Sequence, residues 1–436
     1  MRDPTSWLEK ELPMWQAQGF IQPEQADRLL DHYRRHPPGG SRNLLVILFG
    51  VIGALLIGGG IMLIVAHNWH ELSRPVRAVL SVIPLFVCQV LAGWVLKTRP
   101  ASTAWRESLA LVWVLSVGTA IAMISQTYHM PGSLDQFLIT WMLLSLPVVY
   151  LMRSVTSLMV YLAGITSWSF MANDVGHSSQ WFWLLFAVVL PIMVWWNRTN
   201  PHGGPATLSR WCFIIVGYCG LGATIDSHSG LVWITVYALF SALLWLAGSR
   251  YEAYAKSAWM RPSINLGGLG LAIIAYMLTW AEFWVGQARE TGFWSAWTKM
   301  EPVTLIVVAA IAIAYGVYAF FAARKRQYLA LMWGSVPLIY LLFANGLTNR
   351  DYVILVTWIC NALFFGAGVA TMRAGLISNH LGQINAGMLI ICTAILSRFF
   401  DADLPILIRA VVFIAIGLAF VTVNIRMSRK RKEVRS

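Results

Sequence analysis

The stretch LLVILFGVIGALLIGGGIMLIVA, residues 44–66, is 23 residues long and contains no charged side chain. A helix of this length, with a rise of about 1.5 Å per residue, crosses the ~30 Å hydrocarbon core of a bilayer with some tilt. The polar stretch HNWHELSRP, residues 67–75, follows it, and a second apolar run opens at Val76. We therefore interpret residues 44–66 as the first membrane span, whose flanking charges largely set the orientation of the chain.

The composition of the whole chain agrees with a membrane protein. Hydrophobic residues make up 58% of the 436 positions and charged residues only 12%, whereas about a quarter of the residues of a soluble globular protein are charged. The apolar runs are continuous and about twice as long as the ~10-residue alternating strands of a β-barrel. These features predict an all-α, polytopic bundle of transmembrane helices. The net charge of +13 is spread over short connections, so nucleic-acid binding is not expected.

The hydropathy pattern predicts fourteen spans. The first eight cover residues 44–66, 76–96, 108–126, 135–152, 155–172, 180–197, 209–225 and 230–247. The last six cover residues 264–285, 302–323, 327–344, 352–372, 380–397 and 404–425. We expect residues 44–425 to form the transmembrane bundle and residues 426–436 to form a basic cytoplasmic tail. The five cysteines all lie inside apolar runs, which argues against a disulfide framework.

Residues 1–43 are predicted to form a cytoplasmic helical hairpin and a linker. Pro23 suits a first helical turn, and the apolar residues that follow it have helical spacing, so we predict a helix over Pro23–Arg35. These apolar residues are Ala26, Leu29, Leu30 and Tyr33. An earlier helix should end at Gly19, and Pro13 is expected to kink or split it. So short a module buries little apolar surface, and we expect it to rest on the membrane face or to bind a cytoplasmic protein partner.

The distribution of basic residues gives an orientation. With both termini in the cytoplasm, 25 of the 32 Lys and Arg residues fall on the cytoplasmic side of the fourteen predicted spans. This bias is the one that the positive-inside rule demands, and one missed or extra span would scramble it. The sequence has no apolar signal-peptide core near residue 1, so we do not expect cleavage there. The expected location is the bacterial inner membrane.

Three stretches resemble the signatures of one family. The first is the hairpin, with Trp15, Gly19, Ile21, Glu24-Gln25-Ala26 and Leu29. The second is Ala66-His67-Asn68-Trp69, with Leu72-Ser73 and Arg77. The third is Gln126-Thr127-Tyr128-His129, followed by Phe137, Trp141 and Leu146-Pro147. Over roughly residues 5–150, the chain resembles the bacterial family of predicted membrane proteins called DUF2157, a domain of unknown function.

The stretch Arg398-Phe399-Phe400-Asp401, before the last span, also resembles a recurrent feature of such proteins. The chain departs from the family pattern at Pro13 and at Gln22, where a better helix-capping residue is usual. The resemblance implies an integral membrane protein without an assigned activity. It therefore implies no catalytic residue and no cofactor.

Polar residues recur at the extracytoplasmic ends of the predicted spans. We expect them to converge on one polar vestibule, and the alternative is that each is hydrated separately at the rim of the bundle. The candidate residues are His67, Asn68, His70, Glu71, Arg77, Gln126, His129, Asp135, Arg398, Asp401, Asp403 and Arg409. Gln89 and Asn361 lie inside predicted spans. They are interpreted as interhelical hydrogen-bonding residues or as part of a permeation pathway.

No arrangement in the sequence predicts a metal site, a cofactor or a catalytic residue. His67 and His70, with Glu71 adjacent, supply only part of a metal-binding set. The sequence has no Walker-type phosphate loop, nucleophile elbow or His-Glu zinc helix. Asp401 and Asp403 resemble the paired acids of membrane glycosyltransferases, but those enzymes generally need larger extracytoplasmic elements than this chain offers.

Three functional hypotheses follow. Many spans with almost no loop mass favour a transporter, a flippase or a channel-like protein, and do not favour an enzyme. The first alternative is a membrane sensor or scaffold that recruits a partner through the N-terminal hairpin. The second alternative is a lipid-linked sugar transferase. A central polar cleft would support the first hypothesis, and a solid apolar bundle the sensor or scaffold.

The predicted orientation is tested by labelling single cysteines in intact cells, in a background without native cysteines. Cysteines at positions 70 and 292 should react with an impermeant reagent, whereas a cysteine at position 325 should be protected. The opposite pattern at positions 70 and 325 would invert the topology.

Overall fold

The computed structural model describes residues 4–35, 71–174, 178–201, 203–225, 230–252, 255, 257–288, 297, 300–344, 350–401, 414 and 417–418. In these residues all regular secondary structure is helical, and there is no β-strand. The chain divides into two compact units, Met1–Leu80 and Ser81–Ser436, and each is described by itself. The predicted all-α class is confirmed.

The first unit contains the predicted hairpin. Helix α1 spans Pro4–Ala17 and helix α2 spans Pro23–Arg35. The side chains of Leu8, Leu12 and Ala26 are buried between them. Pro13 lies inside α1 without splitting it, because a single missing amide donor removes one backbone hydrogen bond while the packing of Leu8 and Leu12 remains. The helix ends before Gly19, whose φ of 74° is left-handed.

The membrane helices occupy the remainder of the described chain. They are α4 (Arg74–Thr98), α5 (Thr103–Tyr128), α6 (Leu134–Met152), α7 (Val155–Asp174), α8 (Trp181–Val188), α9 (Leu190–Thr199), α10 (Gly204–Thr224) and α11 (Gly230–Tyr251). After the short 3-10 helix η2 (Ala258–Met260) come α12 (Pro262–Met277), α13 (Ala281–Ala288), α15 (Pro302–Arg324), α16 (Tyr328–Gly334), α17 (Val336–Ala344), α18 (Arg350–Ile377) and α19 (Leu381–Asp401).

Ten apolar helices in the described residues are long enough to cross a membrane, with α8 and α9 together forming one of them, and the bent pair α12–α13 gives an eleventh if it is a single span. The pair α16–α17 coincides with another predicted segment. Twelve of the fourteen predicted segments therefore correspond to a helix or a helix pair. The segment 44–66 lies outside the described residues, as does 404–425 apart from residues 414 and 417–418, so fourteen spans stays a prediction.

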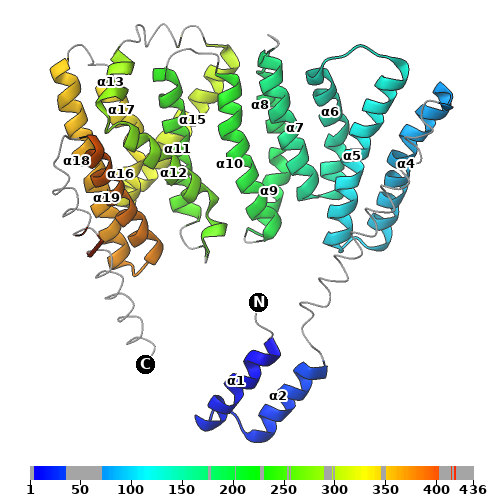
Figure 1. The fold of residues 1–436 in the computed structure, drawn as a ribbon, viewed down its shortest axis with the longest axis horizontal. Helices are drawn as coiled ribbons and strands as arrows, with labels where there is room; N and C mark the ends of the chain where they lie inside the picture. Colours follow the sequence, from blue (N-terminus) through cyan, green and yellow to red (C-terminus); the bar gives the residue numbers. More distant parts are fainter. Residues whose placement is uncertain are drawn as a thin grey trace. The chain divides into compact units, whose positions relative to one another are not determined.

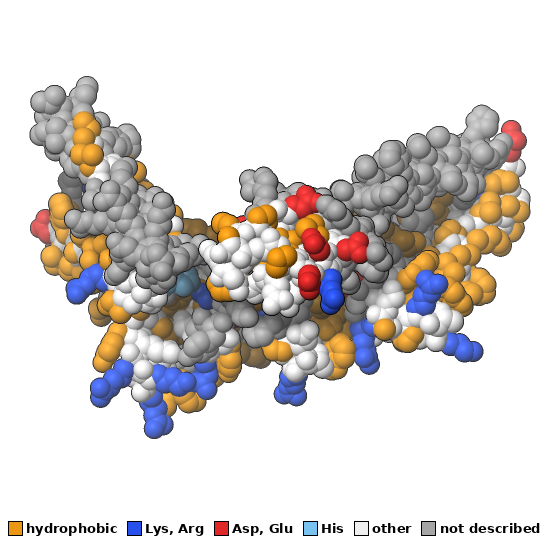
Figure 2. Space-filling model, turned by 90° about the horizontal axis from the view of Figure 1, so that it is seen from below, with side chains coloured by type: hydrophobic (Ala, Val, Ile, Leu, Met, Phe, Trp, Pro, Cys, Tyr) orange, Lys and Arg blue, Asp and Glu red, His pale blue; other side chains and the backbone are white. Residues whose placement is uncertain are grey.

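Within residues 81–436, successive spans stand side by side and run alternately up and down, with α8 and α9 forming one span (Figure 1). The connections α4–α5, α6–α7, α9–α10, α11–α12, α15–α16 and α18–α19 therefore lie at one common end, the lower end in Figure 1. Figure 2, seen from below, shows Lys and Arg side chains distributed along this end. The residues in and beside these connections include Lys97, Arg99, Arg106, Arg153, Arg198, Arg210, Arg250, Arg261, Arg324, Lys325, Arg326 and Arg373.

A half-buried carboxylate ties the α6–α7 turn to α5 at this end. Glu107 accepts hydrogen bonds from the backbone N–H groups of Val155 at 3.0 Å and Thr156 at 2.9 Å, at the start of α7. The neighbouring Arg106 donates to the carbonyl oxygen of Met152, at the end of α6. The two side chains thus satisfy the carbonyl end of one helix and the amide end of the next.

A second carboxylate has the same role at the α11–α12 connection. Glu252 accepts hydrogen bonds from the backbone N–H groups of Ser263 at 2.9 Å and Ile264 at 3.2 Å, in the first turn of α12. Arg210 of α10 lies 3.5 Å away as its ion-pair partner. Burial raises the pKa of the Glu252 carboxyl group above its usual value, although these hydrogen bonds oppose the shift. Glu252 fixes the base of α12.

Glycines allow α18 and α19 to approach closely. A β-carbon built on Gly387 of α19 would lie 2.7 Å from the carbonyl oxygen of Gly368 in α18, which is closer than real side chains come. At Gly220 of α10, the ring of Phe182 occupies the space that a β-carbon would need. Gly366, by contrast, has open space around it. Glycine therefore permits a close helix contact at Gly220, Gly368 and Gly387, but Gly366 makes no such contact.

The glycine contact predicts unequal effects of two substitutions. Gly387→Ala should destabilise the protein by about 1–3 kcal/mol, because the added methyl group overpacks the α18–α19 contact. The matched control, Gly366→Ala, adds the same group to open space and should be neutral or slightly stabilising. Thermal unfolding of the purified proteins in one detergent measures both. Equal unfolding temperatures for the two variants would contradict the close contact.

Candidate functional site

The segment 264–285, predicted as one continuous span, is broken. Helices α12 and α13 meet at an angle of 87° across residues 278–280. At the end of α12, the backbone N–H of Thr279 donates a hydrogen bond to the carbonyl oxygen of Tyr276. The N–H of Trp280 donates to the carbonyl oxygen of Met277. These tight turns end the α-helical ladder. The sequence does not predict the bend, because every residue from Ala275 to Ala281 is compatible with an apolar helix.

A break inside a membrane exposes backbone carbonyl groups, and each needs a donor because hydrocarbon offers none. The indole N–H of Trp284 donates to the carbonyl oxygen of Leu278 at 2.8 Å. The side-chain amide of Asn361 donates to the carbonyl oxygen of Thr279 at 2.9 Å. The guanidinium group of Arg398 donates to the same oxygen. Side chains from three helices, α13, α18 and α19, thus donate hydrogen bonds to the carbonyl oxygens at the bend.

Asn361 and Arg398 are both held in place by further contacts. The Asn361 amide also donates to the carbonyl oxygen of Thr357, one turn earlier in α18, at 2.7 Å. The central guanidinium carbon of Arg398 lies 5.0 Å from the ring centre of Trp280, within the range of a cation–π interaction. Asn361 and Arg398 were predicted as polar residues of separate sites, and the structure brings them together on Thr279.

A cavity of about 170 Å³ lies beside the bend. It is lined by Ala281, Ile354, Thr357, Trp358, Asn361 and Arg398. The volume is well above what one water molecule needs. Trp358 is 68% exposed and Ile354 is 45% exposed, so the cavity borders the outer surface of α18. We call this space the bend cavity.

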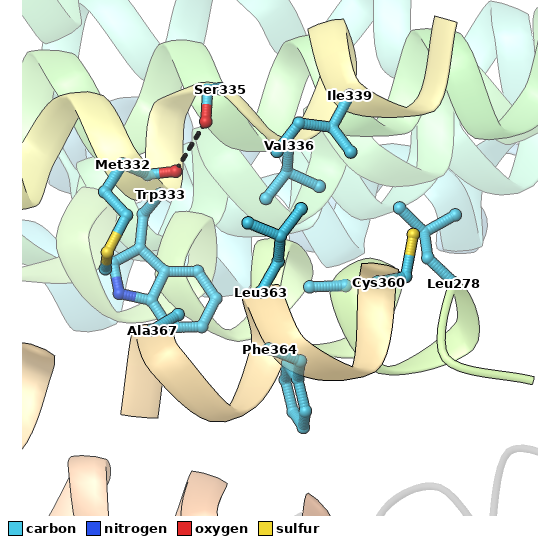
Figure 3. Close-up of a pocket in the computed structure, with 11 residues that line it drawn as sticks. Leu278, Met332, Trp333, Ser335, Val336, Ile339, Cys360, Leu363, Phe364 and Ala367 are labelled. Atoms are coloured by element: carbon cyan, nitrogen blue, oxygen red, sulfur yellow. Dashed lines mark hydrogen bonds between the residues drawn. The ribbon is translucent and has the colours of Figure 1, made fainter. Parts of the chain in front are cut away.

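A second, smaller cavity of about 100 Å³ lies on another side of α18. Its lining is mostly apolar and comes from α12, α16, α17 and α18, with Cys360 and Phe364 among the α18 residues (Figure 3). It flanks the break between α16 and α17, where the hydroxyl group of Tyr315 donates to the carbonyl oxygen of Gly334 at 2.8 Å. Helix α18 therefore separates two cavities, each beside a broken helix.

The other predicted vestibule residues are distributed over both units. His67, Asn68, His70, Asp403 and Arg409 lie outside the described residues. Asp401 is the last residue of α19, and the structure does not describe its side chain. Glu71 is exposed, and Arg77 donates from Nε to the carbonyl oxygen of Leu72 at 2.9 Å, within the first unit.

In the second unit, Gln126 and His129 are exposed at the end of α5, and Asp135 is buried in the first turn of α6. The structure does not place Gln126 or His129 beside Arg398, because α5 and α19 stand far apart in the row of helices (Figure 1). Gln89 is exposed on α4. Within the described residues, no group of three or more His, Cys, Asp or Glu side chains is arranged to hold a metal ion.

Thr279, Trp280 and Trp284 were not among the predicted site residues. One feature of the sequence does point to the bend: Glu282 interrupts an otherwise uncharged segment shortly after Thr279. A carboxylate is costly inside a span. The exposed position of Glu282 in the first turn of α13 is consistent with a helix that turns away at this point.

The hydrogen bonds at the bend predict the effect of Asn361→Leu. This change should cost about 1–2 kcal/mol of stability, because the buried carbonyl oxygen of Thr279 loses a donor. The control is Asn197→Leu, since among the described residues Asn197 donates to the carbonyl oxygen of Met193, in its own helix. Chemical or thermal unfolding in detergent measures the difference. If both variants unfold alike, Asn361 does not support the bend.

Comparison with known proteins bears on the first third of the chain. No curated protein and no solved structure shows a significant match to this sequence. A family model described as "Predicted membrane protein (DUF2157)" matches residues 13–159. The matched region runs from α1 of the hairpin to the start of α7 and includes Glu107, with its partners Val155 and Thr156. The resemblance seen in the sequence is therefore confirmed over residues 13–159, which are similar to the predicted membrane proteins of DUF2157.

Proposed function

We propose that this protein is a transporter or flippase whose substrate pathway passes the α12–α13 bend. The observation that carries the proposal is the broken helix, whose carbonyl end is held by Asn361 and Arg398 beside the bend cavity. Non-helical backbone at membrane depth is tolerated where it is buried in protein or lines a cavity. Discontinuous helices of this kind form the substrate sites of many secondary transporters.

We also propose that the protein lies in the bacterial inner membrane with both termini in the cytoplasm. The common end of the second unit that carries Lys and Arg residues would then face the cytoplasm. The bend cavity lies toward the opposite end of the bundle, since Arg398 is close to the end of α19. On this orientation the bend cavity is near the extracytoplasmic surface.

One observation favours the alternative of a sensor or scaffold. The hairpin has its own small core, and Phe20 at its turn is 74% exposed. Aromatic residues are enriched at protein–protein interfaces, so Phe20 is a candidate contact for a partner protein. The lipid-linked sugar transferase hypothesis depends on Asp401 and Asp403, whose side chains the structure does not describe, so it gains no support here.

The test of transport uses the full chain reconstituted into lipid vesicles. Movement of a fluorescent phospholipid between leaflets and efflux of small trapped anions are measured against protein-free vesicles. Wild-type protein should accelerate at least one of these processes. If it accelerates neither, the proposal fails and the sensor or scaffold is favoured.

A pair of tryptophan variants links that activity to the bend. Trp284→Phe removes the donor to Leu278 and should change the transport rate about fivefold, the equivalent of one hydrogen bond of about 1 kcal/mol. Trp245→Phe removes a comparable bond to Ala330, away from the bend, and should leave the rate near that of the wild type. Equal effects of the two changes would separate transport from the bend.

A further inference from the structure

We infer that the bend cavity binds the phosphate head group of an anionic membrane phospholipid. The inference deepens the proposed function, on which it rests, by naming the chemical class of the ligand. It draws on three properties of the described residues: the donors that line the cavity, the lipid-facing wall and the depth of the site.

The guanidinium group suits a phosphate group. Arg398 lines the cavity beside Asn361 and Thr357, whose own donors already go to backbone carbonyl groups, so Arg398 is the donor for a ligand. A guanidinium group presents several N–H donors in one plane, a geometry that matches phosphate oxygens better than an ammonium group does. The contacts of Arg398 with Thr279 and Trp280 fix its position, so little side-chain entropy is lost when a ligand binds. Glu282 is exposed and does not line the cavity.

The wall of the cavity favours a lipid over a dissolved anion. Ile354 and Trp358 line it and are also among the exposed apolar side chains of α18. In a membrane, that exposed surface faces acyl chains. A ligand that enters beside Trp358 therefore needs an apolar portion that stays in the bilayer and a polar head that reaches Arg398. A phospholipid has both.

The depth of the site agrees with a head group. Arg398 is three residues before Asp401, the last residue of α19, which corresponds to about 5 Å along the helix axis. The indole rings of Trp280 and Trp358 lie at or beside the cavity, and tryptophan side chains concentrate at the level of the head groups. The cavity is therefore placed toward the head groups rather than at the centre of the bilayer.

Binding is tested on the full chain by native mass spectrometry, with phosphatidylglycerol as the probe. Arg398→Gln should weaken binding about tenfold, and Arg398→Lys should restore part of it. Ala281→Phe keeps every donor and fills the cavity, so it should also abolish the site. The controls are Arg373→Gln and Ala310→Phe, since both residues are exposed and line neither cavity. Unchanged binding in the Arg398 and Ala281 variants would overturn the inference.

A measurement on the wild-type protein covers the case in which a variant fails to fold. Phosphatidylglycerol with a photoreactive head group should crosslink to residues 281–284 or 354–361, and crosslinks confined to other segments would overturn the inference. Inorganic phosphate alone should not displace the lipid at millimolar concentration. Displacement would assign the site to a dissolved anion instead.

The outcomes separate this inference from the proposed transport. Lipid binding that depends on Arg398, in a protein that moves neither lipid nor solute across vesicles, would leave the binding site standing and remove the transporter. If Arg398→Gln changes neither transport nor lipid binding, the transporter stands and the lipid site at Arg398 is removed.

Discussion

A backbone carbonyl group in hydrocarbon has no water to bond to, and leaving one unsatisfied costs several kcal/mol. The break after α12 creates such groups at Leu278 and Thr279, and the surrounding helices are arranged to supply their donors. Trp284, Asn361 and Arg398 come from three different helices. Side chains far apart in the sequence are therefore tied to one short stretch of backbone, and apolar packing alone would not specify that arrangement.

Free backbone groups at helix ends are paired differently at the two ends of the bundle. At the end rich in Lys and Arg, helix N-termini present N–H groups, and the carboxylates of Glu107 and Glu252 accept from them. At the bend, a helix C-terminus presents carbonyl groups, and an amide and a guanidinium group donate to them. Each charge thus agrees in sign with the helix dipole that it meets. The polar residues inside this protein are explained first as supports of helix ends.

The sequence predicted the helices far better than the bend. Continuous apolar runs determine where helices form, because length and hydropathy are local properties. The position of Asn361 inside a span marked it as a residue needing a partner. Its partner, Thr279, was not predictable, since the pairing depends on which helices pack together. Arg398 was assigned to a vestibule with Gln126 and His129, but nothing in the sequence indicates that α5 and α19 stand apart.

The close contact of α18 with α19 limits how the bend cavity can open. Gly368 and Gly387 bring the two backbones together, so Asn361 and Arg398 belong to one tightly packed pair of helices. Thr279 and Ala281 belong to the other side of the cavity, on the broken helix. Because α18 also lines the second cavity through Cys360, a rotation of α18 would alter both spaces. A movement of α12–α13 against α18–α19 would open the bend cavity without breaking the glycine contact between α18 and α19. Such a movement must break the hydrogen bonds that Asn361 and Arg398 make to Thr279.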